Sequence, residues 1–157
     1  MKVDLINGGA LVLAVVASVA FGWQRSAPNP GGAAAVVDAT GHKVVPPFTR
    51  IASATTIADE LLLELCPRSS VVAVTEQSKR AVRGYRFGER IGLRSIDYPE
   101  PILSLSPDLL LVANVGAPRR VARLREAGLT VFDLGPPAGW ASLQGYVERV
   151  GALCGEP

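Results

Sequence analysis

The chain has 157 residues, of which 48% are hydrophobic, and it carries 16 Lys and Arg against 14 Asp and Glu. The apolar content and the lack of a glycine period exclude a collagenous or disordered chain. The formal charge is only +2, without a long run of one sign, so the sequence shows no electrostatic footprint for nucleic acid. A globular protein that binds no nucleic acid is therefore expected.

Residues 1–25 are predicted to be an export signal or a membrane anchor. Lys2 precedes an apolar stretch over residues 5–23, and Ser18-Val19-Ala20 offers the small residues that an export peptidase requires. The same stretch is long enough to cross a bilayer uncleaved, so membrane association through it is the alternative. Both alternatives place the remaining chain outside the cytoplasmic membrane, in a periplasmic or other extracytoplasmic compartment.

The rest of the chain divides into a linker and one domain. Residues 26–35 are rich in Pro, Gly and Ala and are predicted to be a flexible linker. Residues 36–157 form a segment of ordinary domain size, large enough to bury one core.

Two cysteines, Cys66 and Cys154, would meet an oxidising environment in that compartment. Each ends an apolar helical pattern, where an isolated buried cysteine is at least as well expected as a disulfide. Their wide spacing matches no metal-binding signature.

The domain begins with a predicted hairpin and continues with alternating strands and helices. Residues 36–38 and 43–45 flank a turn at Gly41, which carries His42, the only histidine. Thr55 or Thr56 is expected to cap the first helix. The predicted strands are 50–53, 71–74, 108–112 and 129–132, the predicted helices are 55–65, 99–105, 118–127 and 141–154, and residues 76–97 are predicted to be a surface loop with a short helix. The last helix is expected to bury Leu143, Val147, Val150 and Leu153.

This alternation predicts an α/β fold: a parallel sheet flanked by helices on both faces, a Rossmann-like lobe preceded by a short β-hairpin. In such sheets ligands bind outside the carboxyl ends of the strands. The residues expected there supply hydroxyls, an amide, a carboxylate and one large aromatic ring, which suits binding better than bond breaking.

Motifs for enzyme chemistry are missing from the sequence. It contains no glycine-rich phosphate loop, no dinucleotide-binding fingerprint and no nucleophile elbow. His42, alone on a turn, provides no convincing general base. We therefore expect no catalytic residue, no metal site and no cofactor, and we predict that the protein is not an enzyme. Four arginines between residues 119 and 125 are interpreted as a solvated helix face.

The order of these segments resembles one known family. The segments 37–46 and 50–53 are similar to the opening of the helical-backbone class of substrate-binding proteins, which serve ABC importers for ferric siderophores, haem and vitamin B12. The most specific part is Glu100-x-Ile102-x-x-Leu105-x-Pro107-Asp108, followed by an apolar strand. The resemblance continues through residues 58–62, 71–75, 124–132 and 151–155, in the order that the family shows.

The resemblance implies a solute-binding component of an ABC transporter that captures an iron chelate, haem or corrinoid and docks to the permease subunits. Family members carry a carboxylate on the outer surface of each lobe that contacts permease arginines, and Glu100 occupies that place. A glutamate that only stabilises the helix dipole is the alternative. The family's ligand cleft implies candidate ligand contacts at Thr55, Thr75, Glu76, Tyr85, Arg94, Asn114 and Trp140, of which Arg94 would suit an anionic chelate or propionate.

The resemblance covers only the amino-terminal lobe of the family. Family members have a second lobe of comparable size, joined through one long helix, and residues 36–157 match none of it. The chain is therefore expected to be a fragment or a lone lobe. The alternative function is a membrane-anchored protein-interaction domain that retains the lobe fold without a transport ligand.

Overall fold

The computed structural model describes residues 34–113 and 118–155. Five short strands form one parallel sheet in the order β5-β4-β3-β6-β7. They are β3 (Ile51–Ser53), β4 (Val71–Thr75), β5 (Ile91–Leu93), β6 (Leu109–Val112) and β7 (Val131–Asp133).

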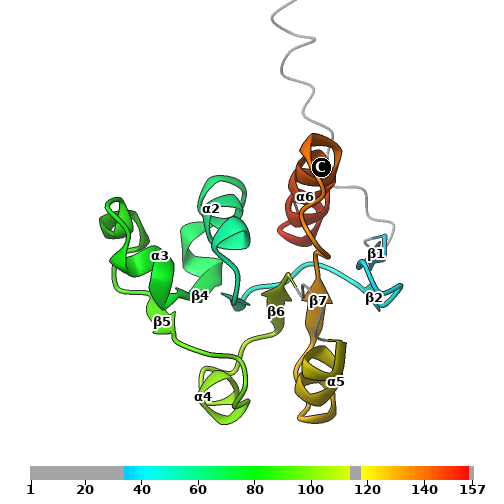
Figure 1. Cartoon of the computed structure of the whole chain (residues 1–157), viewed down its shortest axis with the longest axis horizontal. Helices are drawn as coiled ribbons and strands as arrows, with labels where there is room; N and C mark the ends of the chain where they lie inside the picture. The colour runs from blue at the N-terminus through cyan, green and yellow to red at the C-terminus, as the bar shows by residue number, and fades with distance from the viewer. Residues whose placement is uncertain (1–33, 114–117, 156–157) are drawn as a thin grey trace, which may run out of the picture. The chain divides into compact units, whose positions relative to one another are not determined.

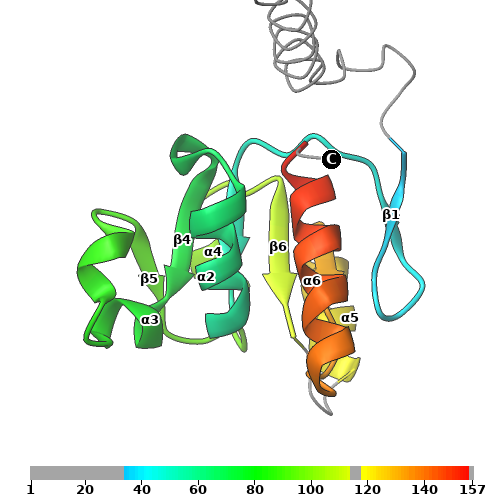
Figure 2. The same cartoon turned by 90° about the horizontal axis from the view of Figure 1, so that it is seen from above.

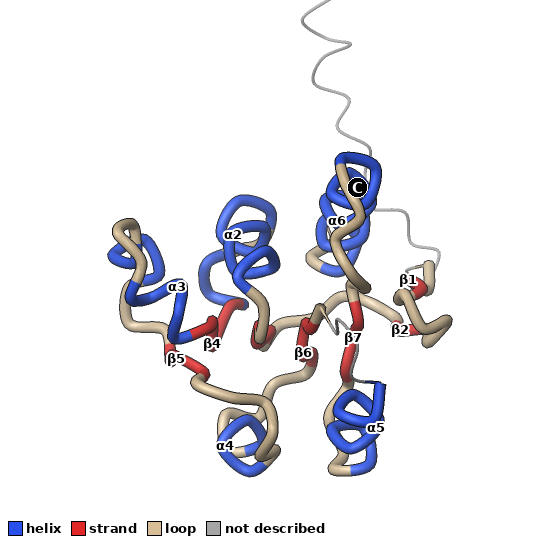
Figure 3. Tube along the Cα trace, viewed as in Figure 1, coloured by secondary structure: helices blue, strands red, loops and turns tan. Residues whose placement is uncertain are grey.

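Helices cover both faces of this sheet (Figures 1 and 3). One face carries α2 (Thr56–Leu65), α3 (Glu76–Arg80) and α6 (Trp140–Leu153). The opposite face carries α4 (Glu100–Leu103) and α5 (Pro118–Glu126). Two 3-10 turns, η1 (Arg68–Ser70) and η2 (Gly84–Phe87), complete the described elements. The predicted α/β fold, with a parallel sheet between two helical layers, is confirmed.

The core follows from the pleat of the strands. In β6, Leu109 and Leu111 join the apolar cluster beneath α2 and α6, whereas Leu110 and Val112 join the cluster beneath α4 and α5. All four side chains are buried, as expected for a strand covered on both faces. This is why the strand reads as a continuous apolar run in the sequence.

The predicted hairpin is also confirmed. Strands β1 (Val36–Val37) and β2 (Lys43–Val44) pair antiparallel, and Gly41 turns the chain with a positive φ of 83°. The hairpin lies beside the β7 edge of the sheet (Figure 1), and Figure 2 shows β1 beyond α6 at one side of the lobe. At this edge the Ala39 N–H donates to the Asp133 carbonyl oxygen at 2.8 Å.

One carboxylate joins the hairpin to the sheet. Asp38 is buried and receives hydrogen bonds from its own turn, through the N–H groups of Thr40 and His42, both at 2.8 Å. It also pairs with Arg125 of α5 at 2.6 Å and accepts from the Asp133 N–H at 3.2 Å. We call Asp38 and these partners the hairpin junction.

Three details of the sequence prediction are wrong. The segment 76–97 holds the predicted short helix, α3, but it also contains an edge strand, β5, which the sequence prediction missed. Thr55 occupies the N-cap position of α2, but its side chain makes no capping hydrogen bond. Leu143 and Val147 of α6 are exposed, and the helix instead buries Tyr146, whose hydroxyl donates to the Gly135 carbonyl oxygen at 2.7 Å.

The two cysteines form a disulfide, which is one of the two alternatives that the sequence left open. Cys66 ends α2 and Cys154 ends α6, and their Cα atoms are 5.3 Å apart. Because α2 and α6 pack side by side on one face, their carboxyl ends meet at the same edge of the sheet. The bond therefore joins two neighbouring helices that are 88 residues apart in sequence.

The predicted signal or anchor and most of the predicted linker lie outside the described residues. Within residues 34–113 and 118–155, no helix is both long and apolar enough to span a membrane.

Candidate functional site

The strand order reverses between β3 and β6, the two central neighbours of the sheet. From β3 the chain proceeds to β4 and β5 on one side, and from β6 it proceeds to β7 on the other. A reversal of this kind leaves a crevice at the carboxyl ends of the strands, where ligands of open α/β sheets bind.

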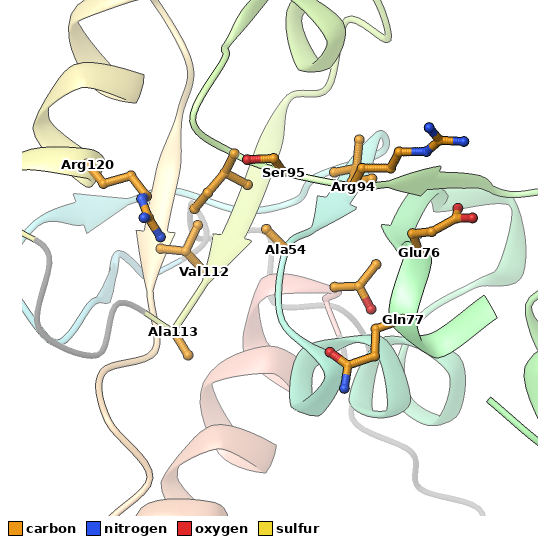
Figure 4. A pocket seen from close by; sticks show the side chains of 11 residues that line it. Ala54, Glu76, Gln77, Arg94, Ser95, Val112, Ala113 and Arg120 are labelled. Atoms are coloured by element: carbon orange, nitrogen blue, oxygen red, sulfur yellow. The ribbon is translucent and has the colours of Figure 1, made fainter. Parts of the chain in front are cut away.

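A cavity of about 390 Å³ lies at this point (Figure 4). Ala54 follows β3, Ala113 follows β6, and their small side chains leave the space open. The polar and charged groups around it include Thr75, Glu76, Gln77, Arg94, Ser95 and Arg120. We call this cavity the carboxyl-edge pocket.

One wall of the pocket is the turn from β4 into α3. The Thr75 hydroxyl caps α3 by accepting from the Ser78 N–H at 3.1 Å. Asp59 of α2 accepts from the Thr75 N–H at 3.0 Å and from its hydroxyl at 2.5 Å. Thr75, predicted as a ligand contact, therefore lies at the pocket with its hydroxyl already engaged.

Glu76 also lies at the pocket, but its carboxylate is occupied. It pairs with Arg80 one helical turn later, at 2.9 Å. Its side chain covers Gly92 of β5 so closely that a Cβ atom at Gly92 would collide with Glu76 Oε2. This carboxylate therefore closes the side of the pocket and fixes α3 against the edge strand.

Two arginines supply the positive charge of the pocket. Arg94 follows β5 and is exposed, and among the described residues its guanidinium has no hydrogen-bond or ion-pair partner. Arg120 of α5 pairs with Asp97 at 3.0 Å. In Figure 4 the Arg120 guanidinium is directed toward Val112, whereas that of Arg94 extends away on the side of Glu76. An anionic ligand could therefore meet a positive group on either side of the pocket.

The other predicted ligand contacts do not line this pocket. Thr55 faces the first turn of α2, where its backbone N–H donates to Ser53 Oγ at 3.3 Å. Tyr85 is 82% exposed on η2, and Trp140 is 75% exposed at the start of α6. Asn114 lies outside the described residues.

The sequence prediction missed Gln77 and Arg120. Gln77 follows Thr75 and Glu76 in the same polar turn, so its position after a buried strand was a usable signal. Arg120 lies in the basic segment for which the sequence pattern indicates a solvated face. That segment is divided in the structure, because Arg120 lines the pocket while Arg125 belongs to the hairpin junction.

Glu100 is exposed and is the first residue of α4. Within the described part of the chain its carboxylate makes no ion pair. At this helix start the negative charge of Glu100 interacts favourably with the helix dipole, as the alternative interpretation requires. The same carboxylate is also accessible to a partner.

Beside the pocket, an open groove runs over α2, α3 and α6. Its apolar lining includes Ile57, Leu61, Leu143 and Val147, and Gln77 borders both the groove and the carboxyl-edge pocket. The exposed side chains of α6 thus contribute to a surface hollow rather than to the core.

Metal ligands do not cluster in the described residues, where no group of three or more His, Cys, Asp or Glu side chains could hold an ion.

Solved structures similar to this chain are periplasmic binding proteins. A periplasmic haem-binding protein from Pseudomonas aeruginosa is 23% identical with a TM-score of 0.60, over 70% of this chain and 39% of its own length. CeuE of Helicobacter pylori, solved in a Ni-His complex, is 19% identical with a TM-score of 0.68, over 79% and 43%. The vitamin B12-binding protein BtuF of Vibrio cholerae is 26% identical with a TM-score of 0.54, over 67% and 41%.

No family model and no curated protein matches the sequence. The chain spans about two fifths of the length of the solved proteins that it matches. The partial coverage fits one lobe of such proteins. The resemblance found in the sequence is confirmed at the level of structure: the chain has the fold of a lobe of the periplasmic binding proteins for haem, vitamin B12 and related ligands.

Proposed function

We propose that this chain is the amino-terminal lobe of the solute-binding component of an ABC importer, acting outside the cytoplasmic membrane. It captures an anionic iron chelate, haem or corrinoid at the carboxyl-edge pocket and performs no chemistry on it. The observation that carries this proposal is the position of the pocket, at the reversal of strand order in a fold shared with periplasmic binding proteins. The arginines on its two sides support an anionic ligand.

Arg94, Arg120 and Gln77 are the proposed ligand contacts, whereas Thr75 lines the pocket and positions the turn that carries Gln77. A guanidinium presents paired N–H donors that match a carboxylate in two parallel bonds. Arg94 has no competing carboxylate among the described residues, whereas Arg120 has to exchange Asp97 for the ligand. Arg94 is therefore expected to contribute more to affinity.

Titration of the full chain with haemin, cyanocobalamin and a ferric hydroxamate siderophore tests this function. We expect one of the three to bind, and Arg94→Ala to weaken its binding about tenfold, which corresponds to ~1.4 kcal/mol for a lost charged contact. Arg83→Ala is the matched control, because Arg83 is exposed outside the pocket. Failure of all three probes to bind, or equal losses in both variants, would contradict the proposal.

We also propose that Glu100 is the permease-docking carboxylate of this lobe. Its exposure at the start of α4 and its lack of an ion pair among the described residues support this role. A rim charge mainly accelerates and orients association. Glu100→Arg should therefore slow capture by the permease at low salt and lose this effect at high salt, whereas Glu89→Arg, at another exposed glutamate, should not.

A further inference from the structure

Asp59 is a buried carboxyl group that lies behind the wall of the carboxyl-edge pocket. Its side chain belongs to α2 and the residue is 0% exposed. One oxygen, Oδ2, accepts both bonds from Thr75. The other, Oδ1, is buried and has no hydrogen-bond partner among the described residues. Such an oxygen is costly when the group is ionised and much less so when it carries a proton.

The bonds of Asp59 reach the pocket through a short chain of hydroxyl groups. Asp59 holds Thr75, and the Thr75 hydroxyl lies 3.0 Å from Ser78 Oγ while it caps α3. Thr75, Glu76 and Gln77 all line the pocket, so the Asp59 carboxyl links the pocket-lining turn at the start of α3 to α2.

The neighbours of Asp59 are hydroxyl and backbone groups. Burial raises the pKa of Asp59, and the hydroxyls of Thr75, Ser78 and Ser53 and the Thr75 N–H offset this only in part.

Charged side chains on the elements that pack against α2 are engaged elsewhere. On α3, Glu76 pairs with Arg80 and Lys79 donates to the Arg90 carbonyl oxygen. On α6, Arg149 donates to the Leu134 carbonyl oxygen, and Glu148 is exposed. On α2 itself, Glu60 and Glu64 both pair with Arg86. None of these bonds reaches the Asp59 carboxyl.

We propose that Asp59 is a positioning residue whose protonation state sets the geometry of the Thr75–Ser78 turn and, through it, the shape of the carboxyl-edge pocket. With a proton on the carboxyl, Oδ2 still accepts from Thr75 and the turn stays as observed. When the proton leaves to solvent, Oδ1 becomes a buried charged acceptor. The Ser78 hydroxyl is then drawn from Thr75 toward the carboxylate, and the adjacent Gln77 moves with it.

The free protein tests this proposal without any ligand. We expect the amide NMR signals of Thr75, Gln77 and Ser78 to shift together in one step as the pH rises from 4 to 8. Asp59→Asn should remove this step, since the amide keeps an acceptor for Thr75 but does not ionise. Glu64→Gln is the matched control on the same helix and should leave it intact. Identical titration curves in the wild-type protein and Asp59→Asn would overturn the proposal.

A second measurement concerns the ligand and rests on the proposed function. The affinity for whichever of haemin, cyanocobalamin or ferric hydroxamate binds should change across the same pH step in the wild-type protein, and Asp59→Asn should lose that change. Asp59→Ala separates positioning from folding: a folded variant with weakened binding at every pH supports the role, whereas unchanged binding contradicts it. If none of the probes binds, the proposed function fails while the titration of the free protein still decides the role of Asp59.

Discussion

Two of the buried aspartates of this lobe, Asp38 at the hairpin junction and Asp59 at the carboxyl-edge pocket, differ in how completely their carboxyl oxygens are bonded. Asp38 has partners for both oxygens, with Thr40 and His42 on one and Arg125 and Asp133 on the other. Asp59 has partners for one oxygen only among the described residues. Both carboxyls connect segments that are distant in sequence, but only the first is equipped to remain charged.

The pKa values follow this difference. Burial alone would raise the pKa of Asp38, but the bonds from Thr40, Asp133 and His42 together lower it below its ordinary value. For Asp59 burial dominates and the pKa is raised. A complete set of donors thus makes a buried carboxylate a permanent structural charge, whereas an incomplete set leaves a group that responds to pH.

One of the two largest expected effects is at the hairpin junction. Asp38→Ala should lower the free energy of unfolding by about 3 kcal/mol, because it leaves Arg125 and buried N–H groups without their acceptor. Urea denaturation measures the loss. Asp97→Ala is the control, since it breaks an exposed pair with Arg120 and should cost ~1 kcal/mol or less. Equal losses would remove the distinction between a buried junction and a surface pair.

The disulfide anchors the other end of the helix that carries Asp59. Replacing Cys66 and Cys154 together by Ala should lower the free energy of unfolding by about 2 to 4 kcal/mol, because the unfolded chain loses a constraint over 88 residues. Hydrogen exchange should show faster opening of α2 and α6 and little change in the hairpin. Faster exchange concentrated in the hairpin would contradict this assignment.

A smaller effect tests how closely the hairpin packs. Gly135→Ala should cost about 1 to 2 kcal/mol, because φ is 80° and the new Cβ atom would lie 2.7 Å from the Ala39 Cβ. Gly139→Ala is the matched control, with φ of 96° and nothing within 4 Å. Because both glycines have a positive φ, the difference between the melting temperatures of the two variants reports the contact with Ala39 alone. Equal melting temperatures would show that the hairpin shifts to accommodate the new Cβ atom.

The smallest expected effect is the pH dependence of stability, which should have opposite signs at Asp38 and Asp59. The lowered pKa of Asp38 gives a stabilisation that is full above about pH 4 and is lost as the pH falls, so the advantage of the wild-type protein over Asp38→Asn should grow from pH 2 to 5. The raised pKa of Asp59 gives a stabilisation that is full below about pH 4 and is lost as the pH rises.

The free energy of unfolding of Asp59→Asn, relative to that of the wild-type protein, should therefore increase between pH 4 and 8 by on the order of 1 kcal/mol. Thermal unfolding at matched ionic strength measures both variants. Parallel curves for the two variants would mean that the aspartates do not differ in the way that their hydrogen bonds indicate.

The sequence predicted the sheet well because its central strands are apolar on both faces. Leu109 to Val112 could only be a doubly covered strand, and Gly41 marked the hairpin turn. The edge strand β5 escaped prediction, since Ile91-Gly92-Leu93 is short and stands among arginines and glycines. Its strand character comes from pairing with β4, a long-range contact that local propensity does not report.

The sequence predicted at which edge of the sheet the candidate site lies, but not which side chains are available there, because long-range contacts decide that as well. Thr75 and Glu76 follow a predicted strand, so topology placed them at the pocket edge, whereas Arg94 follows the unpredicted β5 and was named only from the family resemblance. Which side chains remain available depends on partners distant in sequence, such as Asp59 for Thr75 at a separation of 16 residues. Arg120 reaches the pocket only because α5 lies on the face that borders it, and helix patterns do not encode that placement.

The disulfide also determines how the lobe would survive a cut in its backbone. The loop between Cys66 and Cys154 contains β4 through β7, so a protease that cleaved the exposed segment 136–139 would leave two pieces still covalently joined. A cut between β2 and β3, at the exposed Thr49, would instead separate the hairpin from everything else. The amino-terminal hairpin would then remain attached only by non-covalent contacts, which include the bonds of Asp38, the Ala39–Asp133 hydrogen bond and the packing of Val44 in the core.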